Sequence, residues 1–256
     1  MSLTISAASV DALIANPTSI AGYSSSGPII ISGAITHTQA SNLNAVDASY
    51  IDATVSETSL SNLSSISVDN SSRTTLNKFK FAVNDTSSTA AALNAVQAKT
   101  SEAVNATAIT SISSSVASNI QTLYSGTVPT GIGAVPITVS DSSVAATTLE
   151  AINKFTTGKV TSSAATITGL AADVKALLAQ NDNTVLKIDG DVAITLTDTT
   201  IDSAVLNTVN GQTTGTVTSS ATTITGTASA VNTALTSNAS TATDSIEGLD
   251  AVNAVL

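Results

Sequence analysis

The hydrophobic positions of this chain recur in a fixed pattern. The dipeptide Ile-Thr returns at spacings of roughly 28 residues, and a branched apolar residue stands seven positions after each isoleucine. The copies are Ile109-Thr110, Ile137-Thr138, Ile167-Thr168, Ile194-Thr195 and Ile224-Thr225. A fixed period of this length indicates a tandem repeat, in which each unit buries its apolar face against its neighbours.

Each unit divides into three predicted parts. A short β-branched run such as 193–196 predicts a strand, because branched side chains fit a pleated surface. Asp141 and Asp198 recur just before the next segment, and we interpret them as caps of the helix that follows. That segment is rich in alanine and predicts a helix, for example over 144–152. In another copy, Leu170, Val174 and Leu177 share one face of the predicted helix.

One apolar residue in each predicted helix can be followed along the whole chain. These helix anchors are Leu13, Leu43, Leu63, Leu93, Ile120, Leu149, Leu177, Leu206 and Leu235. They predict about nine units of roughly 28 residues in a single tandem-repeat domain over 1–256. The units over 1–103 are less regular than those over 104–243, and 244–256 is either a cap or a truncated next unit. A close match between 158–169 and 215–226 adds a two-unit period of about 57 residues, measured from Ile167 to Ile224.

The pattern predicts an α/β solenoid, with a parallel β-sheet on one side and short helices on the other. All the Ile-Thr strands would then lie in one sheet, with the isoleucines inward and the threonines outward, because side chains alternate along a strand. A β-solenoid is the alternative fold.

Composition narrows the range of functions. Charged residues make up 10% of the chain, against about 25% in ordinary soluble domains, and aromatic residues make up 2%. The net charge of −10 argues against nucleic acid or an anionic membrane as a partner. The absence of cysteine excludes disulfides and thiolate metal sites, and no apolar run is long enough to predict membrane insertion.

No catalytic motif is apparent, so we expect neither an enzyme nor a cofactor. The single histidine, His37, cannot form a histidine-rich zinc site, and no Gly-X-Ser-X-Gly elbow or glycine-rich phosphate loop is present. His37 is interpreted as a solvated strand or turn residue.

Three other features have a plain structural reading beside a functional one. The oxygen-rich segments 181–183 and 189–191 suit calcium, but they lack the EF-hand spacing, and turn chemistry explains them more simply. Lys78 and Lys80 alternate with Phe79 and Phe81, which predicts a lone strand with its lysine heads in water. Three loop residues would either pack locally or contact a glycan: Tyr23, Tyr50 and Tyr124.

The repeated threonines are the only candidate binding residues. If Thr110, Thr138, Thr168, Thr195 and Thr225 face outward on a flat sheet, they form a ladder of hydroxyl groups. Such a ladder resembles those of solenoid ice-binding proteins, which carry Thr-X-Thr in every coil. The segments 195–197 and 223–225 have that pattern, whereas 138–140 and 110–112 match it only in part. The alternative is that Thr and Ser satisfy turns and solubilise a sheet that has few charges.

Two resemblances complete the sequence-based expectations. The strand-plus-helix unit resembles a leucine-rich repeat, although the Leu-X-X-Leu-X-Leu-X-X-Asn consensus is missing. The segments 166–174 and 223–231 are similar to the Thr/Ser/Ala-rich arrays of large secreted surface proteins of bacteria, particularly cyanobacteria. That resemblance implies an adhesin, an envelope layer or a matrix component, located outside the cell or on its surface.

We therefore expect a non-enzymatic, extracellular structural or adhesive segment that acts as a spacer or as a multivalent surface. Its partners would be neighbouring repeats of a longer parent chain, or cell-surface or glycan ligands. The alternative function is a binding module for ice, glycan or calcium that uses the threonine-bearing face.

Overall fold

The computed structural model describes residues 2–69, 75–238 and 244–256. Its contacts divide the chain into two compact units. Unit 1 comprises Met1–Ser113 and Ser118–Val135, and unit 2 comprises Ser114–Ala117 and Pro136–Leu256. Each unit is described by itself, and the single domain expected over 1–256 stays a prediction. The regular units expected over 104–243 include residues 239–243, which lie outside the described residues.

Unit 1 alternates short strands with short helices. Its first four strands form a parallel sheet in chain order, and the two strands that follow pair with each other. The strands are β1 (Leu3–Ser6), β2 (Ile29–Ile35), β3 (Ile51–Val55), β4 (Lys78–Lys80), β5 (Ser87–Ser88) and β6 (Ser111–Ser115). The α-helices are α1 (Val10–Ala15), α2 (His37–Leu43), α3 (Leu60–Ser64), α4 (Ala90–Gln97) and α5 (Ala117–Leu123), whose first residue is assigned to unit 2. Two 3₁₀ turns, η1 (Ala7–Ser9) and η2 (Pro17–Ser19), flank α1.

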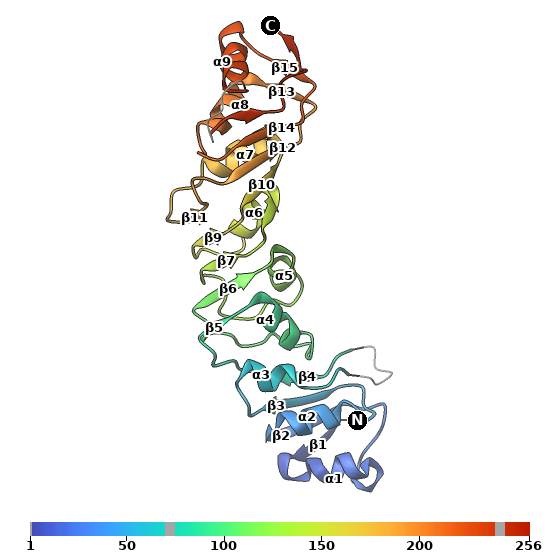
Figure 1. Ribbon diagram of the computed structural model, residues 1–256. Coiled ribbons are helices and arrows are strands. Elements are labelled where there is room, and N and C mark those ends of the chain that lie inside the picture. Colours follow the sequence, from blue (N-terminus) through green and yellow to red (C-terminus); the bar gives the residue numbers. More distant parts are fainter. Residues whose placement is uncertain (1, 70–74, 239–243) are drawn as a thin grey trace. The chain divides into compact units, whose positions relative to one another are not determined.

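Unit 2 continues the alternation, and successive helices from α6 to α9 pack against each other (Figure 1). The helices are α6 (Ala146–Asn153), α7 (Ala171–Leu178), α8 (Ser203–Asn210) and α9 (Ala228–Asn238). The strands are β7 (Ile137–Val139), β8 (Ser143–Ala145), β9 (Val160–Ser162), β10 (Thr166–Gly169), β11 (Leu186–Lys187), β12 (Ala193–Leu196), β13 (Thr200–Asp202), β14 (Val217–Ser219), β15 (Thr223–Thr225), β16 (Ile246–Glu247) and β17 (Asn253–Val255). We call a helix with the strands that precede it a repeat, and name it by its helix.

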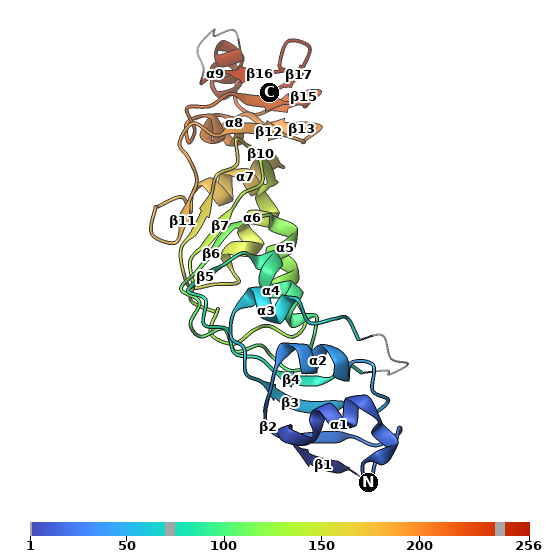
Figure 2. The ribbon, with the colours of Figure 1, turned by 60° about the horizontal axis from the view of Figure 1, so that its bottom comes forward.

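The strands of unit 2 form three parallel rows and not the one sheet that the Ile-Thr pattern predicted. One row is β7–β9–β11, the second is β8–β10–β12–β14–β16, and the third is β13–β15–β17. The strands of the third row lie side by side in Figure 2. The prediction of a single sheet was wrong because each repeat contains two or three strands that are only a few residues long. Runs this short are too brief to show an alternating pattern in the sequence.

The number of strands per repeat changes along unit 2. Before α8 the chain makes three strands, β11, β12 and β13, whereas the α7 and α9 repeats contain two strands each. The α7 strands pair with β11 and β12, and the α9 strands pair with β12 and β13. The pairing therefore shifts by one strand within two repeats. The strands of segment 158–169 lie in the first and second rows, whereas the equivalent strands of segment 215–226 lie in the second and third rows.

The core follows the predicted inward positions. In the second row, one inward residue from each strand stacks on the next, and each is at most 5% exposed: Val144, Ile167, Ile194, Val217 and Ile246. All but one of the predicted helix anchors are fully or almost fully buried. The exception is Leu235, which is 37% exposed, because Ala234 takes the buried position of α9.

Two residues assigned to helical faces lie elsewhere. Leu170 is the N-cap of α7 and is exposed, because the helix begins one residue later than the apolar pattern suggested. Val144 was expected within a helix but lies in β8, and α6 begins at Ala146. In both repeats the strand runs almost directly into the helix.

The interpretation of Asp141 and Asp198 as caps of the helices that follow them was wrong. Asp141 accepts a hydrogen bond from the N–H of Ala117 at 2.7 Å, and Asp198 accepts one from the N–H of Ala171 at 2.8 Å. Ala117 and Ala171 are the first residues of α5 and α7, so each aspartate caps the helix of the preceding repeat. The carboxylate satisfies an N–H group that has no partner within its own helix.

Candidate functional site

The predicted binding residues lie at the expected alternation but not on one surface. The isoleucine of every Ile-Thr copy is at most 2% exposed, and each threonine is half-buried or exposed. Thr168 and Thr195 are paired neighbours in β10 and β12, whereas Thr138 lies in β7 and Thr225 in β15, which belong to the other two rows. The structure therefore brings together two of the five predicted residues.

The first copy is displaced from its strand. Thr110 precedes β6, and its hydroxyl donates a hydrogen bond to the carbonyl oxygen of Thr86 at 2.8 Å. Ile112 is the strand residue, since it pairs with Ser88 of β5 and is fully buried. The predicted register was wrong here because Ile109 and Ile112 both lie among Ser and Thr residues, and the strand uses the later isoleucine.

A continuous threonine surface does exist on the second row of unit 2. Thr168, Thr195 and Thr218 occupy one register position on the neighbouring strands β10, β12 and β14, and Thr166 flanks Thr168 on the same face of β10. We call these four residues the threonine ladder. Thr218 was not among the predicted binding residues because it follows a valine and not an isoleucine.

The hydroxyls of the threonine ladder are chemically uncommitted. Within the described residues, none of these four side-chain hydroxyls makes a hydrogen bond to another protein group. Hydroxyls at neighbouring turns are used instead: Ser163 donates to the carbonyl oxygen of Val139, and Ser220 to that of Leu196, each at 3.0 Å. Each ladder threonine can offer one donor, two acceptor lone pairs and a methyl group, at a strand spacing of about 4.8 Å.

The register position of Thr168, Thr195 and Thr218 continues on the two flanking strands of the second row. Ala145 of β8 occupies it on one side, and Glu247 of β16 on the other. The ladder is therefore a neutral surface with a carboxylate next to one end. It contains no titratable side chain, and its chemistry is limited to hydrogen bonding and methyl contact.

His37 is not the solvated strand or turn residue that we expected. It is the first residue of α2, and its N–H donates to Glu57 Oε2 at 2.8 Å while its Nδ1 lies 3.2 Å from Glu57 Oε1. Partial burial alone raises the pKa of Glu57, but hydrogen bonds from His37, Ser56 and backbone N–H groups outweigh it and hold that pKa below its usual value. The pair joins two repeats.

The oxygen-rich loop between α7 and β12 is held by its own turns. Hydrogen bonds from Thr184 and from the N–H of Val185 lower the pKa of Asp182 to about 2. Asn181 bonds the backbone of Ile188 through both ends of its amide. Among the described residues, no group of three or more His, Asp or Glu side chains could hold a metal ion.

The basic-aromatic segment is a structural strand, as expected, but it is not a lone one. Residues 78–80 form β4 and pair with β3, with Phe79 fully buried. Lys80 forms an ion pair with Asp52 at 2.6 Å, and the Lys78 ammonium lies 4.7 Å from the centre of the Tyr50 ring. Both lysine ammonium groups therefore contact residues in or next to β3.

The phenol groups of the other two tyrosines also make hydrogen bonds to the backbone of their own unit. Tyr23 donates to the carbonyl oxygen of Asp47 at 2.9 Å, and Tyr124 to that of Ile132 at 3.0 Å. Burial raises the pKa of Tyr124 to about 12. Local packing therefore accounts for these side chains.

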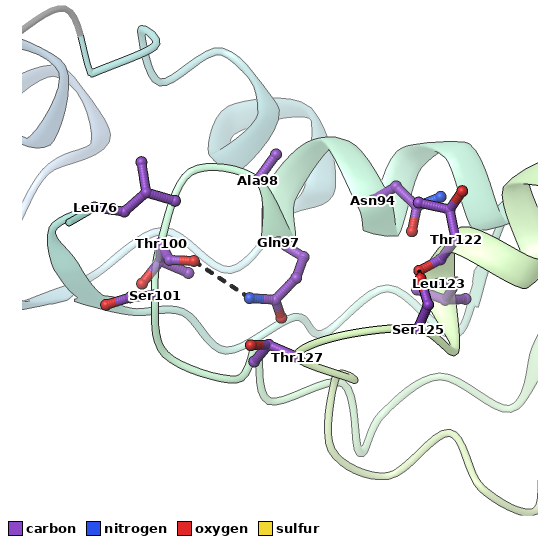
Figure 3. Close-up of a pocket in the computed structure, with 10 residues that line it drawn as sticks. All are labelled: Leu76, Asn94, Gln97, Ala98, Thr100, Ser101, Thr122, Leu123, Ser125 and Thr127. Carbon is purple, nitrogen blue, oxygen red and sulfur yellow. Dashed lines mark hydrogen bonds between the residues drawn. The ribbon is translucent and has the colours of Figure 1, made fainter. Parts of the chain in front are cut away.

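A groove of about 400 Å³ lies beside the C-terminal end of α4 in unit 1. It is lined by uncharged residues, including Leu76, Asn94, Gln97 and Thr100 (Figure 3). The Gln97 amide donates to the carbonyl oxygen of Glu102 and accepts from the N–H of Val104, and Asn94 donates to a backbone oxygen of α5. The amides of this groove hold loops and helices in place, and no acid–base pair lines it.

Comparisons with known proteins return no relative. No protein family, curated protein or solved structure matches the chain. Within the described residues, no helix is long and apolar enough to cross a membrane.

Proposed function

We propose that this chain is a non-enzymatic repeat segment that acts as a spacer or as a multivalent surface. Its repeats would form an α/β solenoid of about nine coils, similar in build to leucine-rich repeats. The observation that carries this proposal is the parallel register of the second row, in which Val144, Ile167, Ile194, Val217 and Ile246 stack strand on strand. A stack of this kind gains length with each repeat while making the same contacts.

The use of polar groups supports the same function. The amides of the α4 groove, the lysines of β4 and the His37–Glu57 pair all connect neighbouring elements. These contacts hold neighbouring elements together. Polar side chains that are used in this way are not free for a catalytic role. The resemblance to bacterial surface arrays adds an extracellular or cell-surface location, where a spacer would hold binding domains away from the envelope.

Force spectroscopy on the full chain, held at its two ends, tests the spacer function. Repeats that contact only their neighbours unravel in steps, and each step releases about 28 residues or a small multiple of that number. At about 3.5 Å per residue, a single repeat adds roughly 100 Å of contour length. Release of the whole chain in one event contradicts a spacer made of separate repeats.

A binding function is the second candidate, and the threonine ladder favours it. Its four hydroxyls are uncommitted, lie on neighbouring strands and carry no charge, which suits ice or a neutral glycan better than calcium. Many weak contacts along such a row would add up through multivalency.

Replacing Thr168, Thr195 and Thr218 by valine removes the hydroxyls but keeps the branched shape. Ice recrystallisation and glycan-array binding are then compared with the wild-type chain. The control is Thr138→Val, which makes the same chemical change in β7 of another row. Loss of activity in the triple variant alone supports the ladder. Inactivity of the wild-type chain in both assays rejects the binding function and leaves the spacer function standing.

A further inference from the structure

The first row of unit 2 ends inside the repeat array, at β11. Among the described strands, β11 is the last of this row, and its strand partner is β9. The row stops because the connection after α8 is short: residues 211–216 lead directly to β14 in the second row, whereas the longer connection 179–192 has room for β11. One edge of β11 is therefore left without a neighbouring strand from the next repeat.

The backbone groups on that outer edge follow from the pairing on the other side. The N–H of Val160 in β9 donates to the carbonyl oxygen of Val185 at 2.8 Å. Because backbone groups point alternately to the two sides of a strand, Leu186 and Ile188 turn theirs to the outer edge. An edge of this kind is a template on which another chain can pair, unless the protein covers it.

The chain's own loop covers this edge. The carboxamide of Asn181 makes two hydrogen bonds with one residue: its Oδ1 accepts from the N–H of Ile188 at 2.9 Å, and its Nδ2 donates to the carbonyl oxygen of Ile188 at 3.0 Å. The N–H of Asn183, whose φ is 62°, donates to the carbonyl oxygen of Leu186 at 3.1 Å. Asn181 therefore takes the place of a paired strand residue, which would also offer one acceptor and one donor.

A second copy of this chain fits the edge by symmetry and by charge. About a two-fold axis at Ile188, the isoleucines of two copies would exchange the bonds that Asn181 now makes. The same antiparallel register sets Lys187 opposite Asp189 of the second copy, on one face of the joined sheet. Within the described residues neither side chain forms an ion pair, so both charges are available.

We infer that Asn181 closes an edge at which a second copy of this chain would otherwise pair, through β11 and the two residues that follow it. The loop 181–185 must leave the edge before the copies can meet, and loss of the two Asn181 bonds favours that movement. The closed edge keeps the chain single, a property that goes beyond the proposed spacer function.

Sedimentation velocity on the full chain at increasing protein concentration tests this inference. Asn181→Leu keeps the approximate size of the side chain but removes its donor and acceptor, so we expect a species of about twice the wild-type mass to form as concentration rises. The matched control is Asn183→Gly, which removes an exposed amide of the same loop, keeps the backbone N–H and suits the positive φ. This control and the wild-type chain should both remain monomeric.

Charge variants in the Asn181→Leu chain test the register. Adding Lys187→Glu places two acids opposite each other and should abolish the dimer. Adding Asp189→Lys as well restores the pair of opposite charges and should restore the dimer. If circular dichroism shows that Asn181→Leu does not fold, Asn181→Asp replaces it, because this variant keeps the acceptor for the N–H of Ile188 and loses only the donor.

Three results would overturn the inference. The first is a folded Asn181 variant that stays monomeric at every concentration. The second is a wild-type chain or an Asn183→Gly control that dimerises to the same extent. The third is a dimer that forms equally well with Lys187→Glu, since the copies would then meet at another surface.

Discussion

Asn77 is a buried polar side chain of unit 1 whose amide links several segments, and its removal should destabilise that unit. It is 1% exposed and lies immediately before β4. Its Oδ1 accepts from the N–H of Ile51 at 2.7 Å, and its Nδ2 donates to Asn44 Oδ1 at 2.8 Å. Asn44, itself 4% exposed, donates onward to the carbonyl oxygen of Ser67. One amide therefore links three successive segments of the repeat array.

The magnitude follows from what Asn77→Ala leaves behind. The N–H of Ile51 loses its acceptor in the interior, which costs about 1–3 kcal/mol, and the lost bond to Asn44 adds about 1 kcal/mol. The vacated volume of the carboxamide adds a smaller packing cost. We expect the free energy of unfolding of unit 1 to fall by about 3 kcal/mol.

The assay uses the tyrosines as a local probe. The chain has no tryptophan, and its three tyrosines, Tyr23, Tyr50 and Tyr124, all lie in unit 1. Tyrosine fluorescence in a urea titration therefore reports on this unit. The control is Asn84→Ala, which removes an exposed amide of the same unit. If the two variants shift the midpoint equally, the buried amide is not a tie between repeats, and the reasoning is refuted.

Three further substitutions test the packing and the junctions. Leu206→Ala in α8 removes a fully buried side chain and should lower the stability of unit 2 by about 3 kcal/mol in a urea titration followed by circular dichroism. Gly226→Ala should lower the midpoint of the same titration, because Gly226 has φ of 138° and a Cβ there would overlap the Ser203 hydroxyl; Gly133→Ala, with open space around it, should be neutral. Because the pKa of Glu57 is lowered in the folded chain, its stabilisation is present above the unfolded pKa and is lost as pH falls through the folded pKa. Glu57→Gln should therefore reduce the acid dependence of the midpoint of unit 1, and an unchanged pH profile would contradict this assignment.

The inward positions of the repeat could be predicted from the sequence. Ile137, Ile167, Ile194 and Ile224 are core residues because β-branched side chains at a fixed period have few alternative locations. The helix anchors were also predictable, apart from Leu235, where an alanine one position earlier faces the core. Apolar residues identify burial well even when the element that carries them is very short.

The rows to which these residues belong could not be predicted. Ile194 and Ile224 look equivalent in sequence, yet Ile194 pairs with Val217, and Ile224 pairs with Ile201. Which short strands become neighbours depends on the number of strands in each repeat, and strands this short leave no periodic signal. For the same reason only Thr168 and Thr195 of the predicted binding face came together.

The carboxylate caps were missed for a different reason. An aspartate just before a helix normally accepts a hydrogen bond from that helix, as Asp202 does from Ala204 and Val205. Asp141 and Asp198 stand slightly further back, beside the preceding repeat, and reach its first N–H instead. A local pattern cannot distinguish the two cases, because the choice depends on which helix lies closer in space.

The spacing of three buried threonines defines the structural period of the chain. Thr100, Thr156 and Thr213 lie two repeats apart from one another, each is at most 6% exposed, and each hydroxyl accepts from a backbone N–H just after it in the chain. The capping aspartates repeat at the same spacing. A period of a single repeat would make every junction alike, whereas from α3 onward these residues make neighbouring junctions different and alternate ones equivalent. The two-repeat block is therefore the unit that the hydrogen bonds specify, and the shorter spacing of the Ile-Thr dipeptides reflects the apolar packing of its two halves.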